Sequence, residues 1–86
     1  MTVSLRSDIS TTPVDDGMIL LNERTGRYWQ LNANGTLVLN ALLSCASTAE
    51  AARHLREEHP RLPVMQAEAD VSALLTSLRN ALLLTS

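Results

Sequence analysis

Cys45, His54 and His59 are the only cysteine and histidines of this chain, and both residue types serve in catalysis and in metal binding. A nucleophilic mechanism needs a nucleophile, a base within hydrogen-bond reach and a group that orients the base. Cys45 falls in the expected turn after the first helix, where a small, partly buried apolar residue is the simpler interpretation. Both histidines fall on the second helix, and nothing around them resembles a nucleophile elbow. The sequence therefore predicts no catalytic residue and no enzymatic activity.

Metal and cofactor sites are disfavoured by the same residues. The two histidines are five positions apart and have no third ligand candidate at useful spacing, whereas structural zinc takes four ligands. One cysteine makes neither an intrachain disulfide nor a cysteine-based metal site. With three glycines, the chain has no phosphate-cradling loop. We expect no metal and no cofactor.

The charge pattern argues against nucleic acid as a partner. The formal net charge is −2, and the seven basic residues, all arginine, are spread along the chain. Nucleic-acid binding normally leaves a basic patch that neutralises several phosphates. No signal-peptide run opens the chain and no segment has the length of apolar residues needed to cross a bilayer. The expected location is the cytoplasm, without a membrane partner.

The first third of the chain has strand patterns. Residues 3–12 alternate weakly between apolar and polar, and Pro13 should end this strand before a turn at residues 15–17. The short apolar run 18–22 is typical of a central strand. A tight connection ending in Gly26 then leads to a third strand at 27–31. This strand and the run 18–22 should form an antiparallel hairpin.

Helical patterns fill the rest of the chain. Asn32 is a good N-cap for a helix over residues 33–44. The segment Ser47–Glu50 is a capping box, which opens a second helix that should end near His59, before Pro60. A third helix is expected over residues 64–82. Three strands followed by three helices predict an α+β fold, with residues 1–86 as one domain.

The third helix has more apolar surface than one contact stripe requires. One side would carry Ala67, Leu74 and Leu78, and the other Val71, Leu75 and Leu82. In one interpretation the helix buries both sides between the sheet and the other helices. In the other, one side lines a groove for an apolar partner, and Asp70 is a groove-edge carboxylate that meets a Lys or Arg of a bound peptide. Asp70 as an ordinary solvated helix acid is the alternative.

The strand "RYWQL" contains the only Tyr and Trp of the chain at adjacent positions. On a strand these rings point to opposite faces, so if Leu31 faces the core, Trp29 does too, while Tyr28 and Gln30 face away. This strand has no Pro or Lys to protect an exposed edge. An unprotected edge beside an apolar helix is typical of domains that capture an extended peptide by strand addition.

The order of these segments is similar to that of a known family. The succession "GMILLNERTGRYWQLNANGTLVLNALL", "STAEAARHLREEHP" and "ADVSALLTSL" resembles PqqD-like domains known as RiPP recognition elements, over about residues 14–84. The resemblance implies a winged helix-turn-helix-like fold with a three-stranded antiparallel sheet followed by three helices. It also implies binding of the leader segment of a ribosomally made precursor peptide, added to the third strand and packed against the third helix.

A stand-alone chain of this size is most similar to the recognition proteins of lasso-peptide systems. The resemblance then implies delivery of the precursor to a separate leader peptidase of the cysteine protease type, with an ATP-dependent cyclase acting afterwards. Many relatives have a glycine that ends the turn after the first helix, whereas this chain has "SCAS" at residues 44–47. This departure concerns the geometry of the turn and not the groove.

The sequence thus predicts a non-enzymatic module that binds a leader peptide. Its expected peptide-binding residues come from the third strand and the third helix: Arg27, Tyr28, Trp29, Gln30, Leu31, Ala67, Asp70, Val71, Leu74 and Leu78. One alternative is a small winged-helix transcription factor, which needs a basic recognition helix; the third helix has Arg79 against Glu68 and Asp70. A dimerisation module that uses the same sheet edge is a further alternative.

Overall fold

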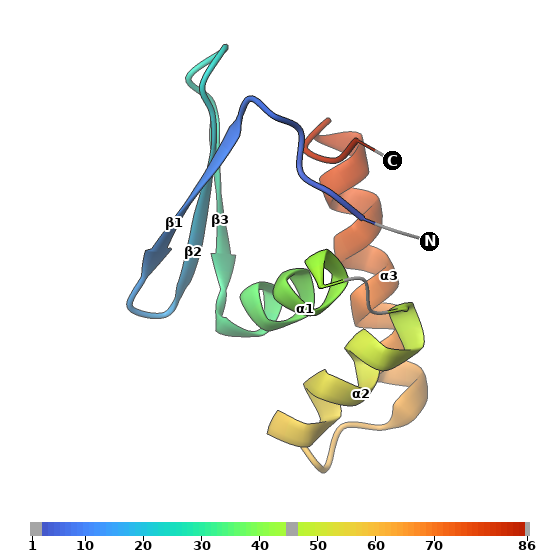
Figure 1. Ribbon diagram of the computed structural model, residues 1–86. Helices are drawn as coiled ribbons and strands as arrows, with labels where there is room; N and C mark the ends of the chain where they lie inside the picture. The colour runs from blue at the N-terminus through green and yellow to red at the C-terminus, as the bar shows by residue number, and fades with distance from the viewer. Residues whose placement is uncertain (1–2, 45–46, 86) are drawn as a thin grey trace.

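A three-stranded antiparallel sheet precedes three helices in the computed structural model, which describes residues 3–44 and 47–85 (Figure 1). The elements are β1 (Ile9–Val14), β2 (Gly17–Asn22), β3 (Tyr28–Asn32), α1 (Ala33–Leu43), α2 (Thr48–Glu58) and α3 (Val64–Asn80). This arrangement confirms the predicted α+β fold class. Cys45 and the middle of the "SCAS" turn lie outside the described residues.

The hairpin of β2 and β3 forms where the sequence predicts it. Leu20 pairs with Trp29 and Met18 pairs with Leu31 in the antiparallel register. Gly26 has a φ of +77°, the left-handed conformation expected at the end of the connecting turn. At the other end of β2, a Cβ on Gly17 would overlap the carbonyl oxygen of Leu31, so the close approach of these strands requires glycine there.

The first strand differs from the prediction of residues 3–12. It spans Ile9–Val14, and Pro13 lies inside it, paired with Met18. The amide of Glu23 donates to the carbonyl of Asp8 at 2.9 Å, and alternation along the ladder from this bond turns the nitrogen of Pro13 away from β2. A proline that needs no hydrogen bond is tolerated in an edge strand. The predicted break at Pro13 is therefore wrong.

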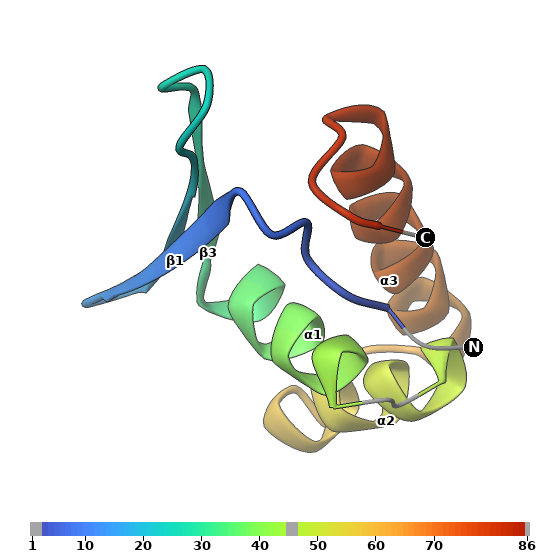
Figure 2. The same ribbon diagram turned by 45° about the horizontal axis from the view of Figure 1, so that its top comes forward.

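The residues before β1 pair with the end of the chain. The amide of Arg6 donates to the carbonyl of Leu83 at 3.0 Å, and the amide of Thr85 donates to that of Ser4 at 2.9 Å. These bonds flank an antiparallel bridge between Leu5 and Leu84. The weak alternation of residues 3–8 thus belongs to a contact between the two termini, close to the C-terminal end of α3 (Figure 2).

Polar caps set the starts of α1 and α2, as predicted. The side-chain oxygen of Asn32 accepts from the amide of Gly35 at 2.8 Å, and the hydroxyl of Ser47 accepts from that of Glu50 at 3.1 Å. The return contact of the capping box goes from the Ser47 hydroxyl to the Glu50 carboxylate, at 3.4 Å, and not from the Ser47 amide. The second helix ends at Glu58, with His59 as its C-cap.

The third helix ends earlier than predicted. Its last residue is Asn80, and Leu82 has a φ of +60°. The amide of Leu83 donates to the carbonyl of Leu78, and that of Leu82 to the carbonyl of Arg79, both at 3.0 Å. These two bonds make a Schellman motif with a leucine where glycine is usual. Leu82 is consequently 66% exposed, outside the apolar face that the sequence assigned to it.

The helices lie on one side of the sheet (Figures 1 and 2). Helix α1 packs on β2, β3 and α2, and α3 packs on α2. The core between these elements is made by aliphatic side chains, the largest fully buried ones being Leu20, Leu39, Leu42, Val71 and Leu83. No helix in the described ranges has the length and apolar character needed to cross a membrane.

Candidate functional site: an open strand edge and an apolar pocket

The third strand has an edge that pairs with no strand in the part of the chain that the structure describes. The sheet order is β1-β2-β3, and β3 lies on the side nearest α3 (Figure 1). The amide of Asn22 donates to the carbonyl of Arg27 at 2.8 Å. Because backbone groups alternate in direction along an antiparallel strand, those of Trp29 and Leu31 turn to β2. The N–H and C=O groups of Tyr28 and Gln30 therefore point to the open edge.

The side chains of β3 alternate as the sequence predicts. Trp29 and Leu31 are half-buried and pack against the core, whereas Tyr28 is 67% exposed and Gln30 is exposed. The guanidinium of Arg27 lies over the indole of Trp29, 5.6 Å from the ring centroid, which is a cation–π distance. The inner face of the strand thus carries two apolar side chains and a covering arginine, while its outer face carries an exposed phenol and amide.

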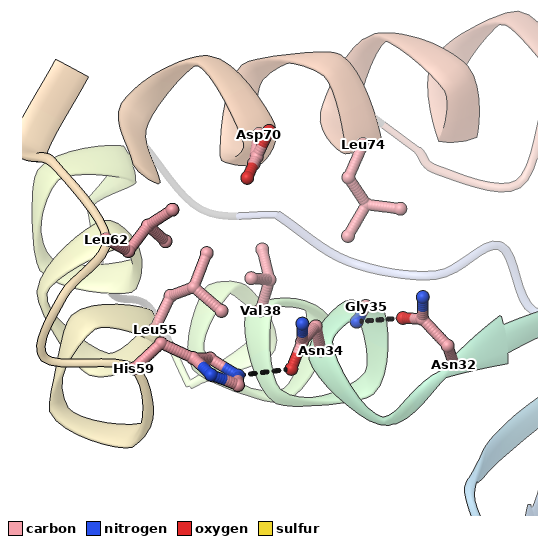
Figure 3. Close-up of a pocket in the computed structure, with 9 residues that line it drawn as sticks. All are labelled: Asn32, Asn34, Gly35, Val38, Leu55, His59, Leu62, Asp70 and Leu74. Carbon is pink, nitrogen blue, oxygen red and sulfur yellow. Dashed lines mark hydrogen bonds between the residues drawn. The ribbon is translucent and has the colours of Figure 1, made fainter. Parts of the chain in front are cut away.

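A pocket of about 540 Å³ opens where β3 ends, between α1 and α3 (Figure 3). Its lining comes from the end of β3, the first half of α1, the last turns of α2, the α2–α3 linker and the middle of α3: Asn32, Asn34, Gly35, Val38, Leu55, His59, Leu62, Asp70 and Leu74. Leu74 and Asp70 point from α3 towards Val38 and the start of α1 on the opposite wall. The pocket is therefore apolar at its centre and polar at its rim.

The residues predicted on the third helix fall into two groups. Asp70 and Leu74 line the pocket. Ala67, Val71 and Leu78 are at most 3% exposed and belong to the core. Together with Leu75 they form one buried stripe at helical spacing, instead of two separate apolar sides. On this helix the structure thus leaves Asp70 and Leu74 accessible to a ligand.

The polar groups of the pocket differ in how far they are engaged. The oxygen of Asn32 is occupied as the cap of α1, and that of Asn34 lies 2.7 Å from the Nε2 atom of His59. The Oδ1 atom of Asp70 accepts a hydrogen bond from the side-chain amide (Nε2) of Gln66 at 2.8 Å. Among the described residues, Asp70 forms no ion pair within 4.0 Å.

Most of the pocket lining was not predicted from the sequence. Val38 and Leu55 look like ordinary core positions of α1 and α2, and Asn34 and His59 are 25 residues apart. The one local signal is Leu62, an apolar residue in a linker between Pro60 and Pro63. Only the packing of the helices brings these side chains to one place.

The histidines take part in local polar contacts. His54 lies 3.1 Å from the carboxylate of Glu57 on the same helix, and His59 contacts Asn34. Within residues 3–44 and 47–85, no group of three His, Cys, Asp or Glu side chains is placed to hold a metal ion.

The DNA-binding alternative finds no support in the structure. A recognition helix presents basic side chains to base edges. Helix α3 has one basic residue, Arg79, in its last turn, while Glu68 and Asp70 are exposed in its first half.

An unpaired strand edge beside an apolar pocket is the arrangement of domains that bind extended peptides by strand addition. The family profile of coenzyme PQQ synthesis protein D (PqqD) matches residues 17–84, most of the chain. The chain belongs to the PqqD family. This match confirms the family to which the sequence motifs pointed.

Solved structures with the same fold extend the comparison. A lasso peptide synthetase B1 complexed with the leader peptide is 37% identical, with a TM-score of 0.92 over 100% of both chains. TbiB1 in complex with the TbiA(beta) leader peptide is 24% identical, with a TM-score of 0.85 over 100% of this chain and 96% of that chain, which shows the shared fold. A comparison with curated proteins finds no significant match.

Proposed function

We propose that this chain binds the leader segment of a ribosomally synthesised precursor peptide, most similar to those of lasso-peptide systems, as an additional strand on β3. The observation that carries the proposal is the open edge of β3, which offers the backbone groups of Tyr28 and Gln30 next to an apolar pocket. The similarity to a lasso peptide synthetase B1 that is complexed with its leader peptide supports it.

The geometry of β3 gives each of its residues a place in this binding mode. Backbone hydrogen bonds to Tyr28 and Gln30 would each contribute about 0.5–1.5 kcal/mol net. Peptide side chains opposite Trp29 and Leu31 would point to the inner face, and those opposite Tyr28 and Gln30 to the outer face. Arg27 would cover the end of the inner face through its contact with Trp29.

The helix side of the site is narrower than the sequence alone proposed. Asp70 and Leu74 would contact the peptide directly because they line the pocket. Ala67, Val71 and Leu78 would support the groove from below, since their side chains are buried in the core. Peptide binding therefore depends on few side chains of α3.

The proposal includes a separate enzyme that acts on the bound precursor. The chain itself would act without catalysis. Among the described residues, His59 contacts Asn34 and His54 contacts Glu57, and neither partner is a nucleophile that the histidine could activate. A leader peptidase of the cysteine protease type would receive the precursor, and an ATP-dependent cyclase would act afterwards.

Fluorescence of Trp29 provides the test, because it is the only tryptophan and lies on the binding strand. The probe is the leader peptide of the 37%-identical lasso peptide synthetase B1. We expect it to bind at least about tenfold more tightly than a scrambled peptide of the same composition, a difference of about 1.4 kcal/mol.

Two results would contradict the proposal. The first is equal affinity for the leader and the scrambled peptide. The second is a concentration-dependent dimer that the leader peptide leaves intact and in which the amides of Tyr28 and Gln30 are protected from hydrogen exchange, because the edge of β3 would then be occupied by a second copy of the chain.

A further inference from the structure

We infer that the pocket at the end of β3 accepts a cationic side chain of the bound leader, with an apolar stem and an ammonium or guanidinium head that meets Asp70. The inference rests on the proposed function and deepens it, because it names the chemistry of one anchor of the peptide. It follows from which groups line the pocket and which of them are already engaged.

The pocket wall is suited to an alkyl stem. Val38 and Leu55 are 3% exposed, and Leu62 and Leu74 are half-buried, so the four side chains form an apolar surface that is partly open. Long basic side chains bury their methylene groups along such surfaces while their charged heads reach a polar partner. About 540 Å³ is ample room for one such side chain.

Asp70 is the charged acceptor above this surface. Figure 3 shows its side chain pointing from α3 into the pocket. Gln66 donates to the Oδ1 atom at 2.8 Å, which holds the carboxylate in place and leaves Oδ2 for a ligand. No arginine or histidine of the described chain lies within 4.0 Å of the carboxylate in an ion pair.

The other polar groups compete weakly with Asp70 for a donor. The oxygens of Asn32 and Asn34 already contact Gly35 and His59. The backbone carbonyl of Leu62, another lining residue, is also engaged, because it accepts from the Nε atom of Arg56 at 2.9 Å.

Other ligand classes fit less well for physical reasons. An anionic side chain would be repelled by the carboxylate of Asp70. A purely apolar side chain would take water from the carboxylate without replacing its hydrogen bonds, which costs free energy. A cationic head restores both charge and hydrogen bonding, in the stronger class of charge-assisted contacts.

The test uses three small probes of equal length: pentylammonium, pentan-1-ol and pentanoate. Each is titrated at pH 8 into the ¹⁵N-labelled full chain while amide chemical shifts are recorded. We expect pentylammonium to shift the amides of Asn34, Gly35 and Leu74, and to bind more tightly than pentan-1-ol, with no binding of pentanoate at the same concentration.

Two variants that each remove one negative charge test whether the Asp70 carboxylate is the group that binds the ammonium. Asp70→Asn should weaken pentylammonium binding about two- to fivefold, the range of an exposed ion pair, and leave pentan-1-ol binding unchanged. Glu68→Gln, at an exposed α3 position outside the pocket, should leave both unchanged. The amide spectra of the variants show whether each is folded.

Equal binding of pentylammonium and pentan-1-ol, or equal weakening by Asp70→Asn and Glu68→Gln, would overturn the inference. The leader titration of Trp29 fluorescence distinguishes this failure from that of the proposed function. If the leader binds and the ammonium preference is absent, the cation site is wrong and leader binding stands.

Discussion

Leu74 lies at the boundary between the core and the pocket. It is half-buried and lines the pocket, whereas Leu78, one turn later, is 3% exposed. A side chain that closes a groove contributes contacts to a ligand as well as to the fold. The two leucines therefore form a matched pair for separating binding from stability.

We predict that Leu74→Ala weakens leader binding by about 1–3 kcal/mol, the usual loss when an apolar anchor is truncated. Leu78→Ala should instead lower the free energy of unfolding by about 2–5 kcal/mol, because it leaves a cavity in the core. Trp29 fluorescence measures binding, and urea denaturation followed by circular dichroism measures stability. An unchanged dissociation constant for Leu74→Ala would place this side chain outside the binding surface.

The strand β3 offers its edge through alternate residues. The backbone N–H groups of Tyr28 and Gln30 face the edge, while those of Trp29 and Leu31 face β2. Peptide addition should therefore protect the amides of Tyr28 and Gln30 from hydrogen exchange, with little change at Trp29 and Leu31. Protection confined to α2 would contradict strand addition.

A substitution in the same strand tests its backbone directly. Gln30→Pro removes the N–H that faces the edge and no bond to β2, so the sheet should keep its pairing. We predict a loss of leader affinity of about 1 kcal/mol or more, from one missing hydrogen bond and the added ring. Gln30→Thr is the control, because it changes the side chain and keeps the N–H; an equal loss for this variant would assign the effect to the side chain.

In the whole molecule, α3 is held at two places. Its buried stripe packs on α2, and the segment after its C-terminal end pairs with residues 4–6. Asp8 adds ion pairs that join this region to the β2–β3 turn, at 3.7 Å to Arg6 and 3.9 Å to Arg24. The position of α3 relative to the sheet therefore depends on the contact between the two termini.

Leu83 anchors that contact, since it is fully buried and its carbonyl accepts from Arg6. We predict that Leu83→Ala lowers the free energy of unfolding by about 2–5 kcal/mol. Leu82→Ala is the control, because Leu82 is 66% exposed, and should change it by no more than about 0.5 kcal/mol. Urea denaturation measures both; a loss for Leu83→Ala as small as that expected for Leu82→Ala would mean that the buried Leu83 side chain does not stabilise the fold.

Local sequence determined the elements that depend on near neighbours. Asn32 and Ser47 cap helices because their side chains reach amides three residues ahead, and Gly26 takes a positive φ that other residues resist. The alternation of Trp29 and Leu31 with Tyr28 and Gln30 follows from the two-residue period of a strand. The family motifs, too, are runs of adjacent residues, so they can be recognised from the sequence alone.

Tertiary structure decided what depends on distant parts of the chain. Residues 3–8 have the alternation of a strand, but their partners are residues 83–85, which no local pattern indicates. The third helix has apolar residues on a wide arc, and only its packing on α2 separates the buried stripe from Leu74. The pocket combines side chains from α1, α2, the linker and α3, because a cavity is a property of packed surfaces and not of any single segment.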